Sequence, residues 1–139
     1  MKKIDNKKIL KHFGIKQIPC EYTRTQCMDF YGFIPCGYAD VANREIYVKN
    51  GTRKSVFIHE VCHVLMKHKN SVVYSKTFLL QEIETERLTR NICKKLDLKF
   101  NPANLQYYTK EAKKKKFKIK PRLRKMKQVF KQFLEAVET

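Results

Sequence analysis

Apolar residues recur at helical spacing in four stretches of this chain. The first stretch predicts a short amphipathic helix over residues 3–13, ended by Gly14. The second predicts a helix that begins after an N-cap at Thr52 and continues to about Lys67. The third predicts a long helix over residues 77–96, and the fourth lies close to the C-terminus.

The fourth stretch predicts a helix over residues 122–137. Six apolar side chains share one of its faces: Leu123, Met126, Phe130, Phe133, Leu134 and Val137. This stripe either completes the core of a single domain or mediates dimerisation. Ahead of it, Asn101-Pro102 and the lysine run at residues 113–116 predict a polar link between the third and fourth helices.

Between the first two helices, the pattern changes to short stretches typical of strands. We expect one strand around residues 20–23, a second over residues 37–40 and a third over residues 45–48. The chain is therefore expected to fold as one α+β domain over residues 1–139. In it, a small antiparallel sheet packs against the helices.

Length and composition fit a folded protein without a membrane segment. At 139 residues, with 42% hydrophobic residues, the chain is long enough to bury a core of its own. No run approaches the roughly 20 apolar residues of a membrane span, and the N-terminus leads into no apolar signal region. The five cysteines form an odd set without a CxxC pair, which favours reduced thiols. We therefore expect a cytoplasmic protein.

Charge is the most unusual property of the sequence. The net charge is +18, and residues 94–127 carry fourteen Lys or Arg against two acidic residues. Such a field attracts nucleic acid or acidic proteins. The same composition also suits a lysine-rich surface that contacts only solvent, so charge alone leaves both interpretations open. The basic C-terminal segment, at about residues 99–139, is therefore a candidate nucleic-acid-binding region.

The HExxH pattern occurs at residues 59–63, inside the second predicted helix. Residues four apart share a helix face, so His59 and His63 can present two imidazole nitrogens to one ion. Zinc accepts neutral imidazole and, in catalytic sites, leaves one position for water, whose pKa falls to about 7. Glu60 would then take a proton from water and pass it to the leaving amine. The pattern therefore predicts a Zn²⁺-dependent hydrolase rather than two surface histidines that bind nothing.

A third ligand is expected from the helix predicted over residues 77–96, which carries three neighbouring glutamates. Glu84 falls in the apolar stripe of this helix, whereas Glu82 and Glu86 point to the wetter side. A carboxylate that faces a core needs a compensating cation, and a metal held by two histidines supplies one. Glu84 is therefore the predicted third ligand, with an ion pair to a basic side chain as the alternative.

Three further side chains are candidates for supporting roles. His68 lies five residues after His63, one short of the metzincin spacing, so we expect it at the helix end near the active cleft. Tyr38 and Tyr47 lie on strands that precede the metal helix. Each is a candidate either to stabilise the tetrahedral intermediate or to pack in the core.

A glutamate pattern follows the HExxH helix: residues 82–85, Glu-Ile-Glu-Thr, match the start of an E-x-E-A pattern. Over about residues 36–96, the two helices together resemble the ImmA/IrrE family of metallopeptidases. They are also similar to the peptidase-like part of ArdC-type antirestriction proteins. The resemblance implies a zincin-like fold. It also implies that His59, His63 and Glu84 are zinc ligands and that Glu60 is the catalytic glutamate.

The expected function is that of a zinc-dependent metallo-endopeptidase acting on a cytoplasmic protein. The resemblance implies a helix-turn-helix repressor of a phage or mobile element as one candidate substrate. The alternative is a basic nucleic-acid-binding or antirestriction module in which the metal site is structural or vestigial. A peptidase that acts on proteins attached to DNA would combine the two.

Overall fold

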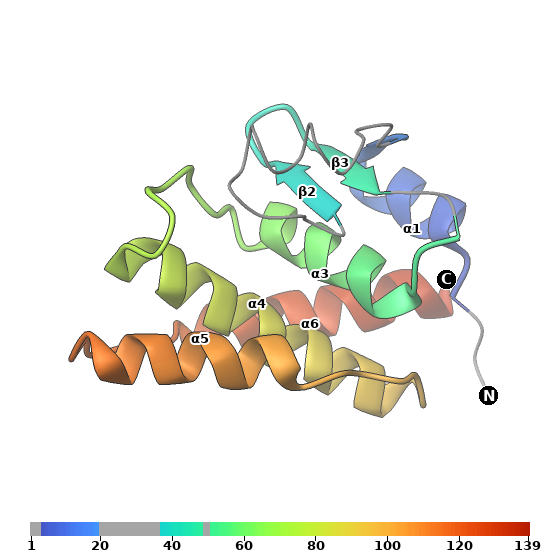
Figure 1. Cartoon of the computed structure of the whole chain (residues 1–139). Coiled ribbons are helices and arrows are strands. Elements are labelled where there is room, and N and C mark those ends of the chain that lie inside the picture. Colours follow the sequence, from blue (N-terminus) through green and yellow to red (C-terminus); the bar gives the residue numbers. More distant parts are fainter. Residues whose placement is uncertain (1–3, 20–36, 49–50) are drawn as a thin grey trace.

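The computed structural model describes residues 4–19, 37–48 and 51–139 and has an α+β architecture (Figure 1). Its helices are α1 (Asn6–Phe13), α3 (Lys54–Leu65), α4 (Lys76–Lys95), α5 (Ala103–Lys114) and α6 (Leu123–Glu138). Its strands are β1 (Lys16–Ile18), β2 (Gly37–Asp40) and β3 (Glu45–Val48). No helix among the described residues is both long enough and apolar enough to cross a bilayer.

The three described strands form one mixed sheet in the order β1-β3-β2. β2 and β3 pair antiparallel, as their short connecting turn requires, and Asp40 supports that turn by accepting a hydrogen bond from the backbone N–H of Asn43. β1 follows α1 directly and pairs parallel to β3, so the prediction of an antiparallel sheet is wrong for this strand. The strand predicted around residues 20–23 lies outside the described residues.

Helix α1 confirms the first helix predicted from the sequence. The Asp5 carboxylate accepts hydrogen bonds from the backbone N–H groups of Lys7 and Lys8, which caps the first turn. The helix ends at Gly14, whose φ of 64° is a left-handed conformation that glycine adopts without a steric penalty. Ile9 is buried, and it anchors α1 in the core.

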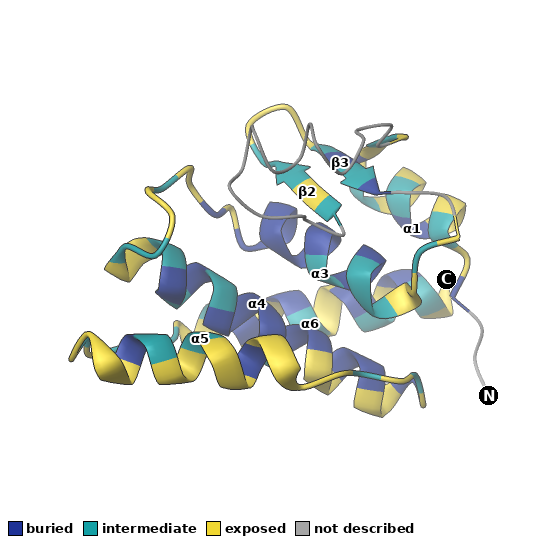
Figure 2. Cartoon of the chain, in the orientation of Figure 1, coloured by how far each residue is buried: buried dark blue, intermediate teal, exposed yellow. Residues whose placement is uncertain are grey.

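Helix α3 lies between the sheet and the remaining long helices, with β2 and β3 on one side and α4 on the other (Figure 1). Its side chains are buried almost without interruption from Phe57 to Leu65 (Figure 2). Helix α4 contacts α3, α5 and α6 and is also buried on more than one face. A site between α3 and α4 is therefore held by the most enclosed helices of the described fold.

Helix α5 occupies the segment that the sequence predicted to be a polar link, and that prediction is wrong. Leu105 and Ala112 are buried against Leu79 and Ile83 of α4, and Tyr108 packs beside them. The rest of the helix is polar and faces solvent, as its exposed outer surface shows (Figure 2). So narrow an apolar face, in a lysine-rich stretch, gives little periodic signal.

Helix α6 places most of its predicted apolar stripe in or against the main core, whereas Leu123 at its start is exposed. Met126, Val129, Phe133 and Ala136 are buried, and the ring of Phe133 stacks on that of Phe13 with centroids 6.4 Å apart. Of the two roles predicted for this stripe, the structure shows completion of the core. The last helix is therefore part of the framework that supports α3 and α4.

Candidate metal and catalytic site

Helix α3 brings the three residues of the HExxH pattern together, as the sequence predicted. The Nε2 atoms of His59 and His63 lie 3.1 Å apart, and their rings meet edge to face. One ligand atom from each histidine and one carboxylate oxygen of Glu60 all lie within 4.8 Å of one another. The helical spacing of residues four apart produces this arrangement directly.

Glu82 of α4 supplies the carboxylate that faces both imidazoles. Its Oε2 lies 3.3 Å from Nε2 of His59, and its Oε1 lies 3.2 Å from Nε2 of His63. Two atoms bound to one tetrahedral zinc ion at about 2.0–2.1 Å are about 3.3 Å apart. The distances between the two imidazoles, and from each imidazole to one oxygen of Glu82, are close to that spacing.

The electrostatics of this cluster also suit a bound cation. Burial alone would raise the pKa of Glu82, but the two facing imidazoles hold that pKa well below its usual range. Burial would lower the pKa of His59, but Glu82 and Glu86 outweigh it and raise that pKa well above its usual value. The carboxylates therefore favour positive charge at this place, which a divalent ion between the three side chains would supply.

Glu84 does not lie at this cluster, so its predicted role as third ligand is corrected. Its carboxylate is fully buried and accepts hydrogen bonds from His68 and Arg122. These partners outweigh the effect of burial and lower the pKa of Glu84 to about 2. The alternative of an ion pair to a basic side chain is the one the structure shows, with Arg122 as the partner.

The error arises because α4 is buried on two different sides. The apolar stripe that contains Glu84 faces α6, whereas the polar stripe that contains Glu82 and Glu86 faces α3. Apolar periodicity identifies a buried face, but it does not identify the neighbour that covers that face. A usable signal was the matching spacing of two pairs, His59 with His63 and Glu82 with Glu86.

Glu86 and His68 lie beside the outer nitrogens of the two histidines. The Oε2 atom of Glu86 lies 3.7 Å from Nδ1 of His59, an ion-pair distance rather than a hydrogen bond. The Nδ1 atom of His68 lies 2.7 Å from Nδ1 of His63. His68 follows the end of α3 and lines the cleft, as predicted for a histidine at the helix end.

Glu60 is buried next to the imidazoles and beside the start of β2. A methyl group on Gly37 would lie 2.8 Å from its Oε2 atom, so a larger residue at position 37 would displace this carboxylate. Burial raises the pKa of Glu60, opposed by the charges of His59 and His63. A raised pKa brings a carboxylate closer to the range in which it exchanges protons near neutral pH.

The cluster opens into a cleft of about 1030 Å³. Gly37, Tyr38 and Ala39 of β2 form part of one wall. Apolar and aromatic side chains form much of the rest: Val56, Val73, Phe78, Phe100 and Tyr108. Of the two tyrosines considered from the sequence, Tyr38 lines this cleft. The ring of Tyr47 lies next to that of Tyr38, with the two ring centroids 5.8 Å apart.

No protein-family model, curated protein or solved structure matches this chain. The chemistry of the site therefore follows from its own side chains. Two imidazoles and a carboxylate match the ligand types of catalytic zinc sites, and a second carboxylate, Glu60, stands beside them. An open cleft gives a substrate access to the group.

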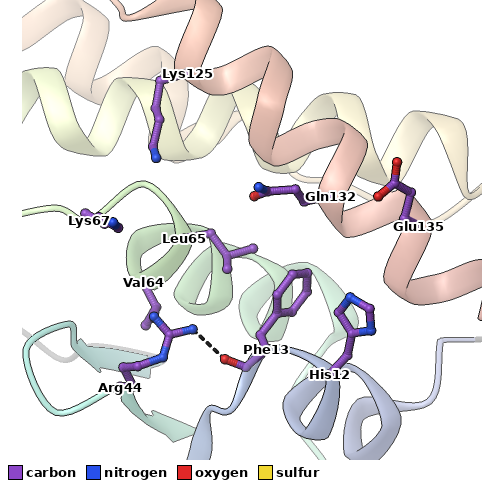
Figure 3. A pocket seen from close by; sticks show the side chains of 9 residues that line it. All are labelled: His12, Phe13, Arg44, Val64, Leu65, Lys67, Lys125, Gln132 and Glu135. Atoms are coloured by element: carbon purple, nitrogen blue, oxygen red, sulfur yellow. Dashed lines mark hydrogen bonds between the residues drawn. The ribbon is translucent and has the colours of Figure 1, made fainter.

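A second, smaller hollow of about 360 Å³ contains none of these histidines (Figure 3). Phe13, Val64 and Leu65 form its apolar part. Basic side chains surround it from elements far apart in the sequence: Arg44 from the turn after β2, Lys67 from the end of α3 and Lys125 from α6. Glu135 of α6 also lines the hollow, so three basic side chains and one acidic side chain meet there.

Proposed function

We propose that this protein is a zinc-dependent metallo-endopeptidase with a zincin-like site. The main support is the spacing of the three ligand side chains, His59, His63 and Glu82, at 3.1–3.3 Å from one another. Zinc in such a site polarises a carbonyl group and lowers the pKa of water to about 7. A structural zinc site is normally closed by four protein ligands, whereas this group opens into a cleft.

Glu60 serves as the general base in this proposal. It accepts a proton from the attacking water as the water oxygen bonds to the scissile carbonyl carbon. It then donates that proton to the amide nitrogen as the C–N bond breaks, which releases a free amine and a carboxylate. Glu60 is buried, yet it also lines the cleft, so its carboxylate can reach a bound water molecule there.

The cleft fits an extended peptide. β2 lines the cleft, so an extended peptide bound there would lie along this strand. Val56, Phe78 and Tyr108 favour apolar side chains in the bound peptide. The substrate is then a flexible, apolar segment of a cytoplasmic protein, and a helix-turn-helix repressor of a mobile element remains one candidate.

The likeness to the ImmA/IrrE family also supports this function, with one change of residue. Glu82 is the first glutamate of the pattern on which the likeness depends, and Glu84 is the second. The proposal assigns the ligand role to Glu82. The likeness to a zinc-peptidase helix pair is kept, because both glutamates belong to the same pattern.

Zinc-dependent cleavage of an unfolded protein tests this function. The purified protein is expected to bind one zinc ion per chain and to cleave reduced, alkylated casein at sites flanked by apolar residues. A chelator should stop cleavage, and added zinc should restore it, as followed by gel and by mass spectrometry of the products. Binding of zinc without cleavage of casein or of a random peptide library would argue against an endopeptidase.

The basic surface favours a second candidate function, nucleic-acid binding. We define this surface as the exposed or partly exposed lysines and arginines from Lys110 to Lys131, on α5, α6 and the segment between them. Within that stretch the only acidic residue is Glu111. The hollow in Figure 3 adds Arg44 and Lys67 beside Lys125, a grouping that suits a backbone phosphate. This function is compatible with a peptidase that acts on proteins attached to DNA.

Salt dependence tests the second candidate. A 20-base-pair duplex is expected to bind, with an affinity that falls steeply between about 50 and 200 mM salt as counterions are released. The double substitution Lys67→Glu and Lys125→Glu should weaken binding at least about tenfold, because it reverses two charges of the phosphate site. The control is Lys94→Glu with Lys95→Glu, at the far end of α4. An affinity insensitive to salt, or equal effects of both pairs, would contradict this function.

A further inference from the structure

We infer that His68, Glu84 and Arg122 form a relay that holds the ligand His63 in its zinc-binding tautomer and orientation. The inference rests on the proposed metal site. The three residues come from the segment after α3, from α4 and from the start of α6. None of them faces the space between the imidazoles and Glu82, so they act as positioning residues through His63.

The first link joins the two histidine rings. Nε2 of His63 faces His59 and Glu82, so Nδ1 carries the proton of a neutral, metal-binding ring. That Nδ1–H can donate to Nδ1 of His68, 2.7 Å away. Metal-bound histidines almost always donate their second N–H to a fixed acceptor. Here the nearest acceptor is Nδ1 of His68, and Oγ1 of Thr85 lies 3.3 Å from both Nδ1 atoms.

The second link fixes the tautomer of His68. Because its Nδ1 accepts a proton from His63, its own proton must lie on Nε2. That Nε2–H donates to Oε1 of Glu84 over 3.0 Å. In His68, Nδ1 is therefore the acceptor and Nε2 the donor, and in His63, Nδ1 is the donor and Nε2 is left to bind the metal.

The third link fixes Glu84 itself. Arg122 donates to Oε2 of Glu84 from its backbone N–H over 2.7 Å and from Nε over 3.1 Å. Its Nη2 donates to Oε1 over 3.0 Å. With His68, each carboxylate oxygen accepts two hydrogen bonds, which uses the usual capacity of both. A fully buried charge is thus compensated by a forked guanidinium, the strongest geometry for such a pair.

Arg122 also joins the relay to the end of α3. Its Nη2 lies 3.4 Å from the carbonyl oxygen of Met66, next to the turn that leads to His68. The relay therefore connects α3, α4 and α6 through hydrogen bonds that are buried at the histidines and partly buried at Arg122. As a consequence, a residue of the basic C-terminal segment, outside the stretch that resembles a peptidase, controls the geometry of a zinc ligand.

Zinc affinity and the visible spectrum of the cobalt-substituted protein test the relay. We expect His68→Leu and Glu84→Gln to weaken zinc binding about 10- to 100-fold in competition with a chromophoric chelator. The Co²⁺ absorption bands should also shift, because the His63 ring changes orientation. His68→Gln should restore most of the affinity, since its amide can accept from His63 and donate to Glu84. The control is Thr89→Val, which alters a buried hydroxyl on α4 outside the relay.

Folding is monitored by far-ultraviolet circular dichroism in the absence of metal, which separates lost affinity from unfolding. A folded His68→Leu protein with wild-type zinc affinity and an unchanged Co²⁺ spectrum would overturn the relay. So would a His68→Gln protein as weak as His68→Leu. Failure of the wild-type protein to bind zinc is a different result, because it would overturn the proposed function on which the relay depends.

Discussion

Replacing Glu60 with glutamine is expected to abolish peptide-bond hydrolysis while zinc binding and the fold are kept. Glutamine has nearly the same shape as glutamate but cannot accept and return a proton. Loss of a general base costs about 10²- to 10⁴-fold in rate. Glu60 has an oxygen within 4.8 Å of both histidines, but the carboxylate oxygens closest to the imidazoles, at 3.2 and 3.3 Å, belong to Glu82, so zinc affinity should change little.

The measurement is the initial rate of cleavage of the casein substrate by zinc-loaded wild-type and Glu60→Gln proteins at equal metal content. The matched control is Glu135→Gln, an exposed glutamate of α6 that lies outside the cleft. The control should cleave at the wild-type rate. A Glu60→Gln protein that keeps more than about a tenth of the rate would show that another group accepts the proton.

The helices that carry the fold could be predicted because their signals are local. Apolar spacing predicted α1, α3, α4 and α6 to within a few residues of the bounds observed. Helix α5 was not predicted because only two of its side chains, Leu105 and Ala112, are buried, and so narrow an apolar face gives a weak periodic signal. The parallel pairing of β1 with β3 could not be predicted from the sequence either, because strand order depends on contacts between distant segments.

In the candidate site, too, local sequence spacing predicts some residues, whereas helix packing decides the others. His59, Glu60 and His63 lie on one helical turn, so their proximity follows from the sequence spacing alone. The choice between Glu82 and Glu84 depends on how α4 is rotated against two neighbouring helices. The apolar stripe gave the more deeply buried carboxylate, and the structure shows that Arg122 and His68 compensate that charge.

Replacing Glu82 with glutamine is expected to reduce zinc affinity more than replacing Glu84 with glutamine on the same helix. The substitution removes the charged ligand and leaves two imidazoles, so affinity should fall by more than about 100-fold, beyond the usual cost of losing an outer partner. Glu84→Gln should cost less, because it acts only through His68 and His63. The two substitutions differ by two positions on one helix, so each serves as the other's matched control.

Thermal unfolding with and without zinc gives an independent measure of the same difference. A metal that binds only the folded state raises the melting temperature in proportion to the logarithm of its concentration over its dissociation constant. We expect a clear rise for the wild-type protein, a smaller rise for Glu84→Gln and almost none for Glu82→Gln. If Glu84→Gln lost the rise completely and Glu82→Gln kept it, Glu84 would be the ligand. The rotation of α4 against α3 would then differ from the one described here, because the carboxylate that faces the imidazoles would belong to the other stripe of the helix.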